Sequence, residues 1–471
     1  MMVNRTFDVV VIGAGPAGEV LAGRLAATGR AVAIVEADLV GGECSFWACM
    51  PSKALLRPGE LLAEVSRVPG AREAVTGAID VQAVLARRDE IVNNLNDDNQ
   101  VPWLEDRGIE LVRGNGRLDG ERRVRVGEEV LNAREAVVVA TGTAAAIPPI
   151  PGLSEVAAWT NREATTASEV PDRLIVLGGG AVGVELAQAW TTLGSKVTLV
   201  EGASRVLPRE EPFASEEVTN GLRDRGVDVR TGVKATAAAR DNGEIVLTLE
   251  TGDPVVGDEI LVAVGRRPRT DDIGLETIGR QPGGYLPTDD QLRVTDVPWL
   301  YALGDVNGRS LLTHMAKYQA RVVADALDGG TLQATRDDAG APRVVFTDPQ
   351  VAAVGLTEQQ AVDAGVDVVT VSHPTSGTAG ASFVGRNAPG TTQLNIDRSR
   401  EVVVGATFTG PEVADLLHAA TIAVVAEVPV ARLWEAVAPF PTRSELWLKL
   451  LERYEELSTA EQRREAVNAA A

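Results

Sequence analysis

The chain has 471 residues, and its 45 basic and 66 acidic side chains give it a formal net charge of −21. Its length predicts about three domains, and its 45% hydrophobic and 24% charged residues are typical of a folded globular protein. So acidic a chain is not expected to bind nucleic acid or anionic membranes. Two cysteines are too few for a disulfide scaffold, and the histidines are His314, His373 and His418.

The N-terminal residues show no targeting or membrane-spanning pattern. Met1 to Thr6 are short and mostly polar, and the apolar run at residues 7–12 is too short for the core of a signal peptide. No run approaches the roughly 20 apolar residues of a membrane helix. We therefore expect a cytoplasmic protein that binds neither a membrane nor nucleic acid.

The strongest signal of organisation is an internal duplication. Residues 7–12 precede the turn Gly13-Ala14-Gly15-Pro16-Ala17-Gly18, and a helical stretch and a second apolar run then lead to Glu36. The same order recurs where residues 174–177 precede Gly178-Gly179-Gly180-Ala181-Val182-Gly183 and a later apolar run ends at Glu201. The acidic residue follows the first glycine at the same spacing in both copies.

Each copy has the pattern of a strand–helix–strand unit that binds a dinucleotide. The first glycine allows a tight turn, the second lets a pyrophosphate approach the backbone, and the third lets helix and strand pack closely. The helix N-terminus offers free N–H groups to the phosphates, and the terminal acid accepts a ribose hydroxyl. Two dinucleotide sites are therefore predicted, at Gly13, Gly15, Gly18 and Glu36 and at Gly178, Gly180, Gly183 and Glu201.

The remaining segments complete the expected order of elements. Three further buried strands are predicted, at residues 136–140, 259–264 and 299–303. Residues 328–343 have the composition of a linker. Strand patterning resumes at residues 344–355 and 395–408, and residues 413–427 have helical periodicity.

Both cysteines fall in one segment, Cys44-Ser45-Phe46-Trp47-Ala48-Cys49, just before Pro51. In a regular helix five residues advance about 7.5 Å along the axis, whereas a disulfide needs Cα atoms within about 6.8 Å. A bridge therefore requires an irregular turn, and Pro51 indicates that a helix begins near Met50, where its N-terminus favours thiolates. The spacing alone leaves open a redox pair, a structural bridge, a metal site or two inert thiols.

The ordered motifs resemble those of the pyridine nucleotide–disulfide oxidoreductases, the family that includes dihydrolipoamide dehydrogenase, glutathione reductase and mercuric reductase. The resemblance runs from Val9 to about Glu445 through both glycine turns, the cysteine segment ending in Pro51-Ser52-Lys53, and residues 140–142, 265–268, 301–305 and 346–358. It implies an α/β fold with two Rossmann-like dinucleotide-binding domains, for FAD and NAD(P), and a C-terminal α+β dimerisation domain. The implied segments are residues 1–152 and 271–342 for the two parts of the FAD-binding domain, 153–270 for the NAD(P)-binding domain and 343–471 for the interface domain.

The resemblance implies a set of residues for FAD and no metal site. The ADP half, the adenine and the pyrophosphate and ribityl chain would meet Gly13, Gly15, Gly18, Glu36, Gly42, Gly116, Thr141, Gly142, Thr143 and Asp305. The flavin ring would lie beside Leu312, Thr313 and His314. Lys53 would lie near flavin N5 and pair with Glu185, so that each charge compensates the desolvation of the other.

The nicotinamide nucleotide would be held by a second set of residues, namely Gly178, Gly180, Gly183, Glu201, Val233 and Gly265. Glu201 suits a free ribose 2′-hydroxyl and would repel a 2′-phosphate. Arg205, four residues after Glu201, keeps NADP(H) possible, but we favour NAD(H).

The family implies an electron path from the nicotinamide through FAD to a Cys44–Cys49 disulfide. Cys49 would lie against the flavin as the charge-transfer thiolate, and Cys44 would exchange with substrate through a mixed disulfide. The expected partners are a small-molecule substrate and a second copy of the chain, whose C-terminal segment would complete the active site.

That C-terminal segment departs from the family pattern of His-Pro-Thr followed by Glu. Here Phe440 stands in the histidine position while Glu445 is kept, and His373-Pro374-Thr375 lies too early to replace it. Phe440 cannot protonate a leaving thiolate or stabilise the Cys44 thiolate by charge, and loss of a general acid–base costs about 10²–10⁴ in rate. Phe46 and Trp47 further predict a more aromatic and apolar active-site entrance than is usual in the family.

We therefore predict a FAD-dependent NAD(P)H oxidoreductase whose substrate does not require the usual histidine. The alternatives are a disulfide reductase like dihydrolipoamide dehydrogenase, a quinone or metal reductase, or an enzyme like 2-oxopropyl-coenzyme M oxidoreductase/carboxylase, which also has Phe at this position. A non-enzymatic alternative is a flavin-holding redox sensor.

Overall fold

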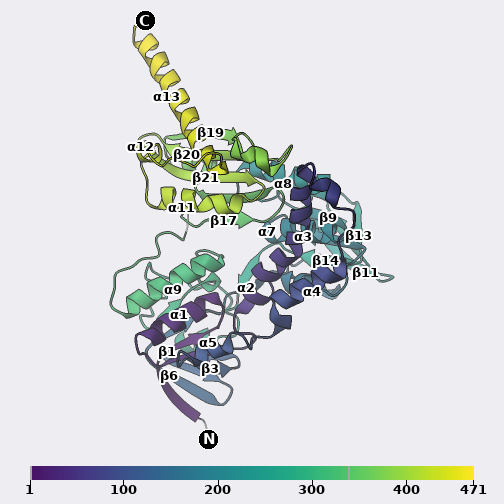
Figure 1. The fold of residues 1–471 in the computed structure, drawn as a ribbon. Helices are drawn as coiled ribbons and strands as arrows, with labels where there is room; N and C mark the ends of the chain where they lie inside the picture. The colour runs from purple at the N-terminus through teal and green to yellow at the C-terminus, as the bar shows by residue number, and fades with distance from the viewer. Residues whose placement is uncertain (1–2, 338–339, 471) are drawn as a thin grey trace.

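The structure is a computed structural model that describes residues 3–337 and 340–470. Figure 1 shows an N-terminal body at the bottom, a second body at the right and a C-terminal body at the top. Helices and strands alternate through the first two bodies, and antiparallel strands followed by helices form the third. The mixed α/β class predicted from the sequence is confirmed.

The first body is built on a seven-stranded sheet in the order β3-β2-β1-β6-β5-β4, with β16 paired to β6. Its strands are β1 (Val3–Ile12), β2 (Val32–Glu36), β3 (Glu110–Arg113), β4 (Gly116–Leu118), β5 (Arg123–Val126), β6 (Glu129–Val139) and β16 (Leu300–Ala302). Strand β1 begins before the predicted apolar run because Val3 to Phe7 pair with residues 129–133 of β6. The parallel strands β3, β2, β1, β6 and β16 direct their carboxyl ends to one edge.

Two helices far apart in the sequence lie side by side in this body (Figure 1). Helix α1 (Pro16–Ala27) and helix α9 (Thr313–Leu327) share one apolar core with β1. Leu21 and Leu25 of α1 and Ala320 and Val323 of α9 are all buried in it. The core therefore holds the N-termini of α1 and α9 at fixed positions in the same body.

The second body has a four-stranded parallel sheet in the order β10-β9-β8-β14. Its strands are β8 (Arg173–Leu177), β9 (Lys196–Glu201), β10 (Asp228–Thr231) and β14 (Glu259–Val262), with helices α7 (Ala181–Thr192) and α8 (Pro212–Asp224). A separate antiparallel sheet contains β11 (Ala235–Asp241), β12 (Glu244–Leu249) and β13 (Pro254–Gly257).

The chain crosses between the first two bodies through paired strands. Strand β7 (Thr143–Ala145) leads out of the first body, and β15 (Arg266–Pro268) leads back and pairs antiparallel with it. The domain boundaries predicted at residues 152, 270 and 342 stay a prediction.

The third body has a five-stranded antiparallel sheet in the order β17-β18-β21-β20-β19. Its elements are β17 (Arg343–Val345), β18 (Gln350–Gly355), α10 (Glu358–Asp363), β19 (Val368–Pro374), β20 (Thr391–Asp397), β21 (Val402–Gly410), α11 (Leu417–Val425), α12 (Val430–Leu433) and α13 (Leu446–Ala470). Leu450 and Leu451 of α13 are buried against the sheet, and the helix then projects away from it (Figure 1).

The remaining helices carry the cysteine segment, lie near it or, in the case of α5, pack in the core of the first body. They are α2 (Gly42–Phe46), α3 (Cys49–Arg67), α4 (Val81–Ile91), α5 (Val101–Glu105) and α6 (Asn161–Thr166). Among the residues described, none of the helices is both long enough and apolar enough to cross a membrane.

Candidate active site

The two glycine turns have the same backbone requirements. Gly13 and Gly178 have φ angles of +107° and +114°, and a Cβ on them would lie 2.4 and 2.5 Å from a carbonyl oxygen of a neighbouring strand end. Only glycine fits this combination of positive φ and close approach. The first glycine of each turn is therefore required by the backbone conformation of the turn.

The second and third glycines of each turn divide the remaining roles. A Cβ on Gly18 or Gly183 would lie 2.0 or 1.9 Å from the carbonyl oxygen of the first glycine, so these positions allow close helix packing. A Cβ on Gly15 or Gly180 would meet nothing within 4 Å. The open space lies at the N-termini of α1 and α7, where free N–H groups and the helix dipole favour phosphate oxygens.

The terminal acids are also equivalent in geometry. Glu36 accepts a hydrogen bond from the Ala14 amide at 2.6 Å, and Glu201 accepts one from the Gly179 amide at 2.5 Å. Each carboxylate is thus fixed against its own glycine turn. Burial raises the pKa of Glu36, partly offset by that amide hydrogen bond.

A cavity of about 420 Å³ collects most residues that were predicted to hold FAD. It lies at the carboxyl edge of the first sheet, and the predicted residues that line it are Gly13, Gly15, Glu36, Gly42, Cys44, Gly116, Thr141, Gly142, Thr143, Asp305 and Thr313. A glycine cradle, a helix N-terminus and a carboxylate positioned for a ribose together fit the ADP half of FAD. Gly18 supports this cavity by packing rather than by lining it.

Asp305 is fixed on the wall of this cavity. Its carboxylate accepts a hydrogen bond from Thr143 Oγ1 at 2.7 Å and lies 3.9 Å from Arg266 Nε. Burial raises the pKa of Asp305, and the Thr143 bond and the Arg266 charge partly offset that increase.

The cysteine segment contains the predicted break between two helices. Helix α2 ends at Phe46, Trp47 and Ala48 leave helical geometry, and α3 begins at Cys49, one residue before the predicted start. Both cysteines are thiols, and their side chains interact with each other. The break supplies the irregular backbone that five-residue spacing requires for such contact.

The two thiols have opposite pKa shifts. The pKa of Cys49 is lowered to about 6: the hydrogen bond with Cys44 is the largest cause, Thr313 and the Lys53 charge add to it, and burial and the Glu185 charge oppose it. The same hydrogen bond, together with burial, raises the pKa of Cys44. Thr313 Oγ1, at the first turn of α9, lies 3.6 Å from Cys49 Sγ. The reduced pair therefore carries its first negative charge on Cys49.

Lys53 and Glu185 form an ion pair between the first and second bodies. Lys53 Nζ lies 2.7 Å from Glu185 Oε2, and the Glu185 side chain is only 6% exposed. The other carboxylate oxygen accepts the Phe346 amide at 2.9 Å, and Lys53 lies 4.8 Å from the Phe346 ring centroid. One pair thus joins α3, α7 and the third body.

The three residues predicted beside the flavin ring lie at the start of α9 and differ in their surroundings. Leu312 is the residue before the helix, and Thr313 lines the cavity. His314 points to the linker instead, since its Nε2 lies 2.8 Å from the Pro342 carbonyl oxygen.

The residues predicted for the nicotinamide nucleotide gather at the carboxyl edge of the second sheet. The Val233 amide lies 3.2 Å from the Glu201 carbonyl oxygen, and Val233 itself is buried. Gly265 has a φ of +152° and open space at its Cβ position. Arg205 donates hydrogen bonds to the carbonyl oxygens of Leu207, Pro208 and Glu210, so its guanidinium is already engaged.

For Phe46, the prediction of a more aromatic entrance is wrong. Phe46 and Trp47 are 1% and 7% exposed and pack with Val92 in a small core. Phe46 is thus covered by protein. Trp47 borders the cavity, and Arg162 Cζ lies 3.8 Å from the centroid of its ring. Phe46 therefore packs inside the segment between the cysteines, whereas Trp47 both packs there and borders the cavity.

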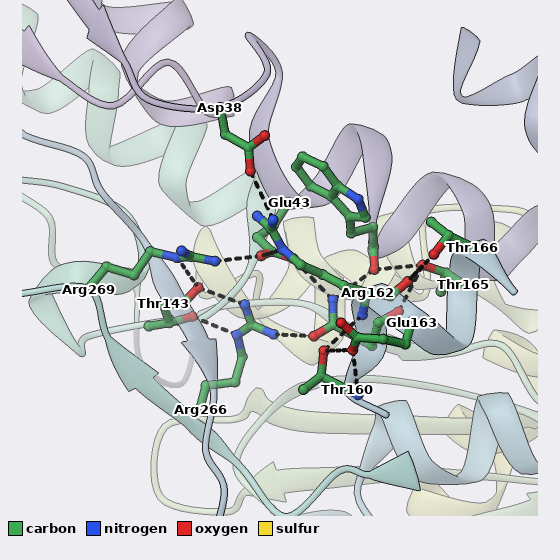
Figure 2. A network of polar contacts seen from close by, with 12 residues as sticks. Asp38, Glu43, Thr143, Thr160, Arg162, Glu163, Thr165, Thr166, Arg266 and Arg269 are labelled. Carbon is green, nitrogen blue, oxygen red and sulfur yellow. Dashed lines mark hydrogen bonds and ion pairs between the residues drawn. The ribbon is translucent and has the colours of Figure 1, made fainter. Parts of the chain in front are cut away.

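A network around Glu43 was not predicted (Figure 2). Arg162 Nε and Arg269 Nη2 lie 2.7 and 2.8 Å from Glu43 Oε1, and Asn161 Nδ2 lies 3.0 Å from Oε2. Arg162 also bonds Asp38 at 2.9 Å. Arg266 lies within the family motif at residues 265–268, whereas Arg162 has no local sequence signal, because its acidic partners are more than a hundred residues away.

This network ties the residue before Cys44 to the second body. Burial opposes the Glu43 charge, but Arg162 and its hydrogen bond overcome this effect and lower the pKa of Glu43. Ion pairs of partly buried groups with several hydrogen bonds contribute more than exposed pairs do.

We expect Glu43→Gln to lower the free energy of unfolding by about 1–2 kcal/mol near neutral pH. Because the folded-state pKa is depressed, the contribution is full above the ordinary carboxyl pKa and is lost as pH falls through the folded value. Urea unfolding at neutral and acidic pH measures the difference. Glu155→Gln, at an exposed carboxylate, is the control; equal stability of both variants would contradict the expectation.

The predicted C-terminal residues lie in the third body, away from the cysteines along the chain. The Phe440 side chain is 76% exposed and Val437 is 87% exposed. Glu445 Oε2 is buried and forms no hydrogen bond within the described part of the chain. These same described residues contain no cluster of His, Cys, Asp and Glu placed to hold a metal ion.

The chain belongs to the pyridine nucleotide–disulphide oxidoreductase family. The family model matches residues 7–320, and the model of the family's dimerisation domain matches residues 341–450. The chain is therefore a flavoprotein oxidoreductase that acts on sulfur groups, uses FAD with a pyridine nucleotide as electron donor, and carries a dimerisation domain.

Several relatives match nearly the whole chain. A dihydrolipoyl dehydrogenase of Thermus scotoductus is 34% identical over 94% of this chain and 96% of the relative. A mercuric reductase of Staphylococcus aureus is 31% identical over 93% of this chain and 81% of the relative. The Cu(II) complex of the HOCl-induced flavoprotein disulfide reductase RclA of Escherichia coli has a TM-score of 0.85 at 27% identity, covering 95% of this chain and 99% of that one.

Proposed function

We propose that this enzyme passes two electrons from NADH through FAD into the Cys44–Cys49 pair and delivers them to a small-molecule acceptor that needs no protein histidine. Bound FAD would supply hydride acceptance and two-electron transfer to a disulfide. The observation that carries the proposal is the helix break, which lets two thiols interact beside the cavity while Cys49 has a lowered pKa. Low-pKa thiols paired in this way are reactive, whereas inert buried thiols have raised values.

The surrounding residues support separate roles for the two sulfurs. Cys49 contacts Thr313 and feels the Lys53 charge, which favours a stable thiolate next to the cofactor cavity. Because Cys49 would carry the stable charge, Cys44 would be the sulfur that exchanges with substrate, as the family resemblance implies, and its raised pKa means that it must lose its proton before it attacks. Lys53 and Glu185 would keep one fixed charge pair beside the flavin ring.

The second nucleotide site favours NADH. Glu201 is held by the amides of Gly179 and Ala203, and a fixed carboxylate suits a ribose hydroxyl and repels a phosphate. Arg205 is engaged by three carbonyl oxygens, so it offers little to a 2′-phosphate.

The acceptor that fits best is a thiol-binding metal ion. Reduction of a divalent mercury ion to the metal converts the dithiol to the disulfide and releases two protons, so no group must protonate a leaving thiolate. Phe440 in place of a histidine would therefore not lower the rate of such a reaction. Relatives named as a mercuric reductase and as a Cu(II) complex of a disulfide reductase support this class.

A second candidate is reduction of disulfides with acidic leaving thiols. The dihydrolipoyl dehydrogenase relative and the retained Glu445 favour disulfide exchange. An acidic thiol leaves as a thiolate without protonation, so this reaction also tolerates Phe440.

The proposed functional unit is a homodimer in which the C-terminal segment of each subunit completes the site of the other. The dimerisation-domain match supports the dimer, and the exposed Phe440 and Val437 supply apolar surface for it. Sedimentation of the holoenzyme tests its oligomeric state.

Anaerobic titration with NADH tests the proposed electron path. We expect one equivalent to produce a long-wavelength absorbance from the flavin next to the Cys49 thiolate, and NADPH to require a higher concentration. Mercuric or cupric ions should then restore the oxidised spectrum. Full flavin bleaching without that absorbance would overturn the path through the cysteines.

A further inference from the structure

The break between the two cysteines leaves a buried carbonyl group that needs a hydrogen-bond donor. The Trp47 amide still bonds the Glu43 carbonyl oxygen at 2.8 Å, but Ala48 has φ −133° and ψ −97°, which is neither helical nor extended. The Trp47 carbonyl group therefore lies at the carboxyl end of α2, where carbonyl groups have no partner within the helix. Because Trp47 is buried, this group depends on a donor from the protein.

The donor is Asn161, the first residue of α6. Asn161 Nδ2 lies 2.8 Å from the Trp47 carbonyl oxygen and 3.0 Å from Glu43 Oε2, and the residue is only 5% exposed. A carbonyl group and an ionised carboxylate can only accept hydrogen bonds, so they orient the amide with its nitrogen toward them. Arg266 Nη1, which can only donate, lies 3.4 Å from Asn161 Oδ1. Both amide hydrogens of Asn161 are thus used on the cysteine segment.

Thr165 does not duplicate this hydrogen bond. Thr165 Oγ1 lies 3.2 Å from the Trp47 carbonyl oxygen, but it lies closer, at 2.8 Å, to the Asn161 carbonyl oxygen within α6. A hydroxyl group has one hydrogen to donate, and the shorter contact takes it. Asn161 is therefore the main donor to the Trp47 carbonyl group.

Helix α6 is itself fixed at both ends by contacts that do not involve the cysteine segment. At its start, Glu163 Oε2 accepts hydrogen bonds from the amide and the hydroxyl group of Thr160 at 2.8 and 2.6 Å (Figure 2). The amide and carbonyl groups of Trp159 each bond β14 at 2.8 Å. At the other end, the buried Arg88 donates to two carbonyl oxygens at 3.0 and 2.9 Å. Asn161 therefore projects from a rigid support.

We propose that Asn161 is a positioning residue for the cysteine pair. By binding the Trp47 carbonyl group, it holds the backbone between α2 and α3 in the shape that brings the sulfurs of Cys44 and Cys49 together. This inference rests on the proposed function, because it concerns the same redox pair. Asn161 acts through the backbone of residue 47 and not on either sulfur.

The expected effect follows from the freedom of the reduced segment. Two thiols held in contact have a high effective concentration, which favours the disulfide. Without the Asn161 hydrogen bond, the reduced segment gains conformations that it must lose again when the disulfide forms. The hydrogen bond between the thiols, the largest cause of the lowered Cys49 pKa, also requires their contact. Loss of the Asn161 amide should therefore weaken the disulfide and make the Cys49 thiolate easier to protonate.

The first test compares the wild type with Asn161→Ala in glutathione buffers, with FAD bound. Two glutathione thiols reduce the Cys44–Cys49 disulfide to two thiols and form one glutathione disulfide. Alkylation followed by peptide mass spectrometry gives the fraction reduced. We expect the equilibrium constant for reduction to rise about tenfold, as for the loss of one buried hydrogen bond. Asn161→Asp, which keeps the size of the side chain but turns an oxygen toward two acceptors, should shift it at least as far.

The second test follows the long-wavelength absorbance of the NADH-reduced holoenzyme as pH falls. In Asn161→Ala the pH at which half of this absorbance is lost should rise by about half a unit or more. Asn132→Ala is the matched control, because Asn132 Nδ2 donates to the Arg5 carbonyl oxygen at 3.1 Å in the first body. It should lower stability to urea by a similar amount and leave both redox measurements unchanged.

An unchanged glutathione equilibrium in Asn161→Ala would overturn the inference, and so would an equal shift in Asn132→Ala. If Asn161→Ala does not fold, the same comparison with Asn161→Asp decides the question. If the wild type gives no long-wavelength absorbance with NADH, the proposed electron path fails. The glutathione equilibrium requires no NADH, so it tests the role of Asn161 in either case.

Discussion

Replacing Cys49 with Ser should abolish the long-wavelength absorbance, whereas replacing Cys44 with Ser should leave it visible even before NADH is added. When Cys44 is replaced, Thr313 and the Lys53 charge still favour the Cys49 thiolate, and the serine hydroxyl can donate the hydrogen bond that the Cys44 thiol donated, so Cys49 is the sulfur that remains a thiolate. Both variants lose the dithiol, and acceptor turnover should fall on the order of 10³-fold or more, as when one member of a unit of catalytic groups is removed. Absorbance spectra and acceptor-dependent NADH oxidation measure the two effects.

The pH dependence of this absorbance has a definite sign. Since the pKa of Cys49 is lowered to about 6, the two-electron-reduced wild type should keep the absorbance at neutral pH and lose it as pH falls through that value. Ser45→Ala, within the same segment, is a control that should keep both spectrum and turnover. An absorbance that survives in Cys49→Ser, or disappears in Cys44→Ser, would assign the two sulfurs the other way round.

Replacing Phe440 with His should raise the turnover of dihydrolipoamide or glutathione disulfide by about 10²-fold or more, within the usual range for a general acid–base. The exposed Phe440 leaves space for an imidazole, and Glu445 Oε2 is buried without a hydrogen bond in the described residues. This substitution would give the Glu445 carboxylate an imidazole to orient. The measurement is kcat/KM with each substrate across neutral pH.

Phe440→Leu separates the effect of the imidazole from the loss of the ring. It should leave disulfide turnover low, and metal-ion reduction should be similar in the wild type, Phe440→Leu and Phe440→His. If Phe440→His left disulfide turnover unchanged, the missing histidine would not be what limits that reaction.

Local pattern predicted the geometry of the two glycine turns because the requirements of such a turn are local. Gly13 and Gly178 need a positive φ, and Glu36 and Glu201 bond amides of their own glycine turns, so spacing along the chain carries the geometry. The irregular turn between the cysteines followed in the same way from the reach of a helix.

The rest of the site depends on contacts between distant segments. Glu43 lies next to Cys44 in sequence, but its partners Arg162 and Arg269 belong to other elements. No periodicity or motif spacing in the sequence predicts these ion pairs. Phe46 was assigned to an entrance because of its place in the motif. In the structure, the break between α2 and α3 instead places Phe46 in a small core with Val92.

The pairing of β7 with β15 has an evolutionary consequence. Because the outgoing and returning strands hydrogen-bond to each other, the second nucleotide-binding body begins and ends at almost the same place on the first. A unit whose ends lie together can be inserted into, or exchanged within, a host without disturbing the host's core. The arrangement of the chain therefore allows the second body to be replaced or altered as one unit while the first body keeps its fold.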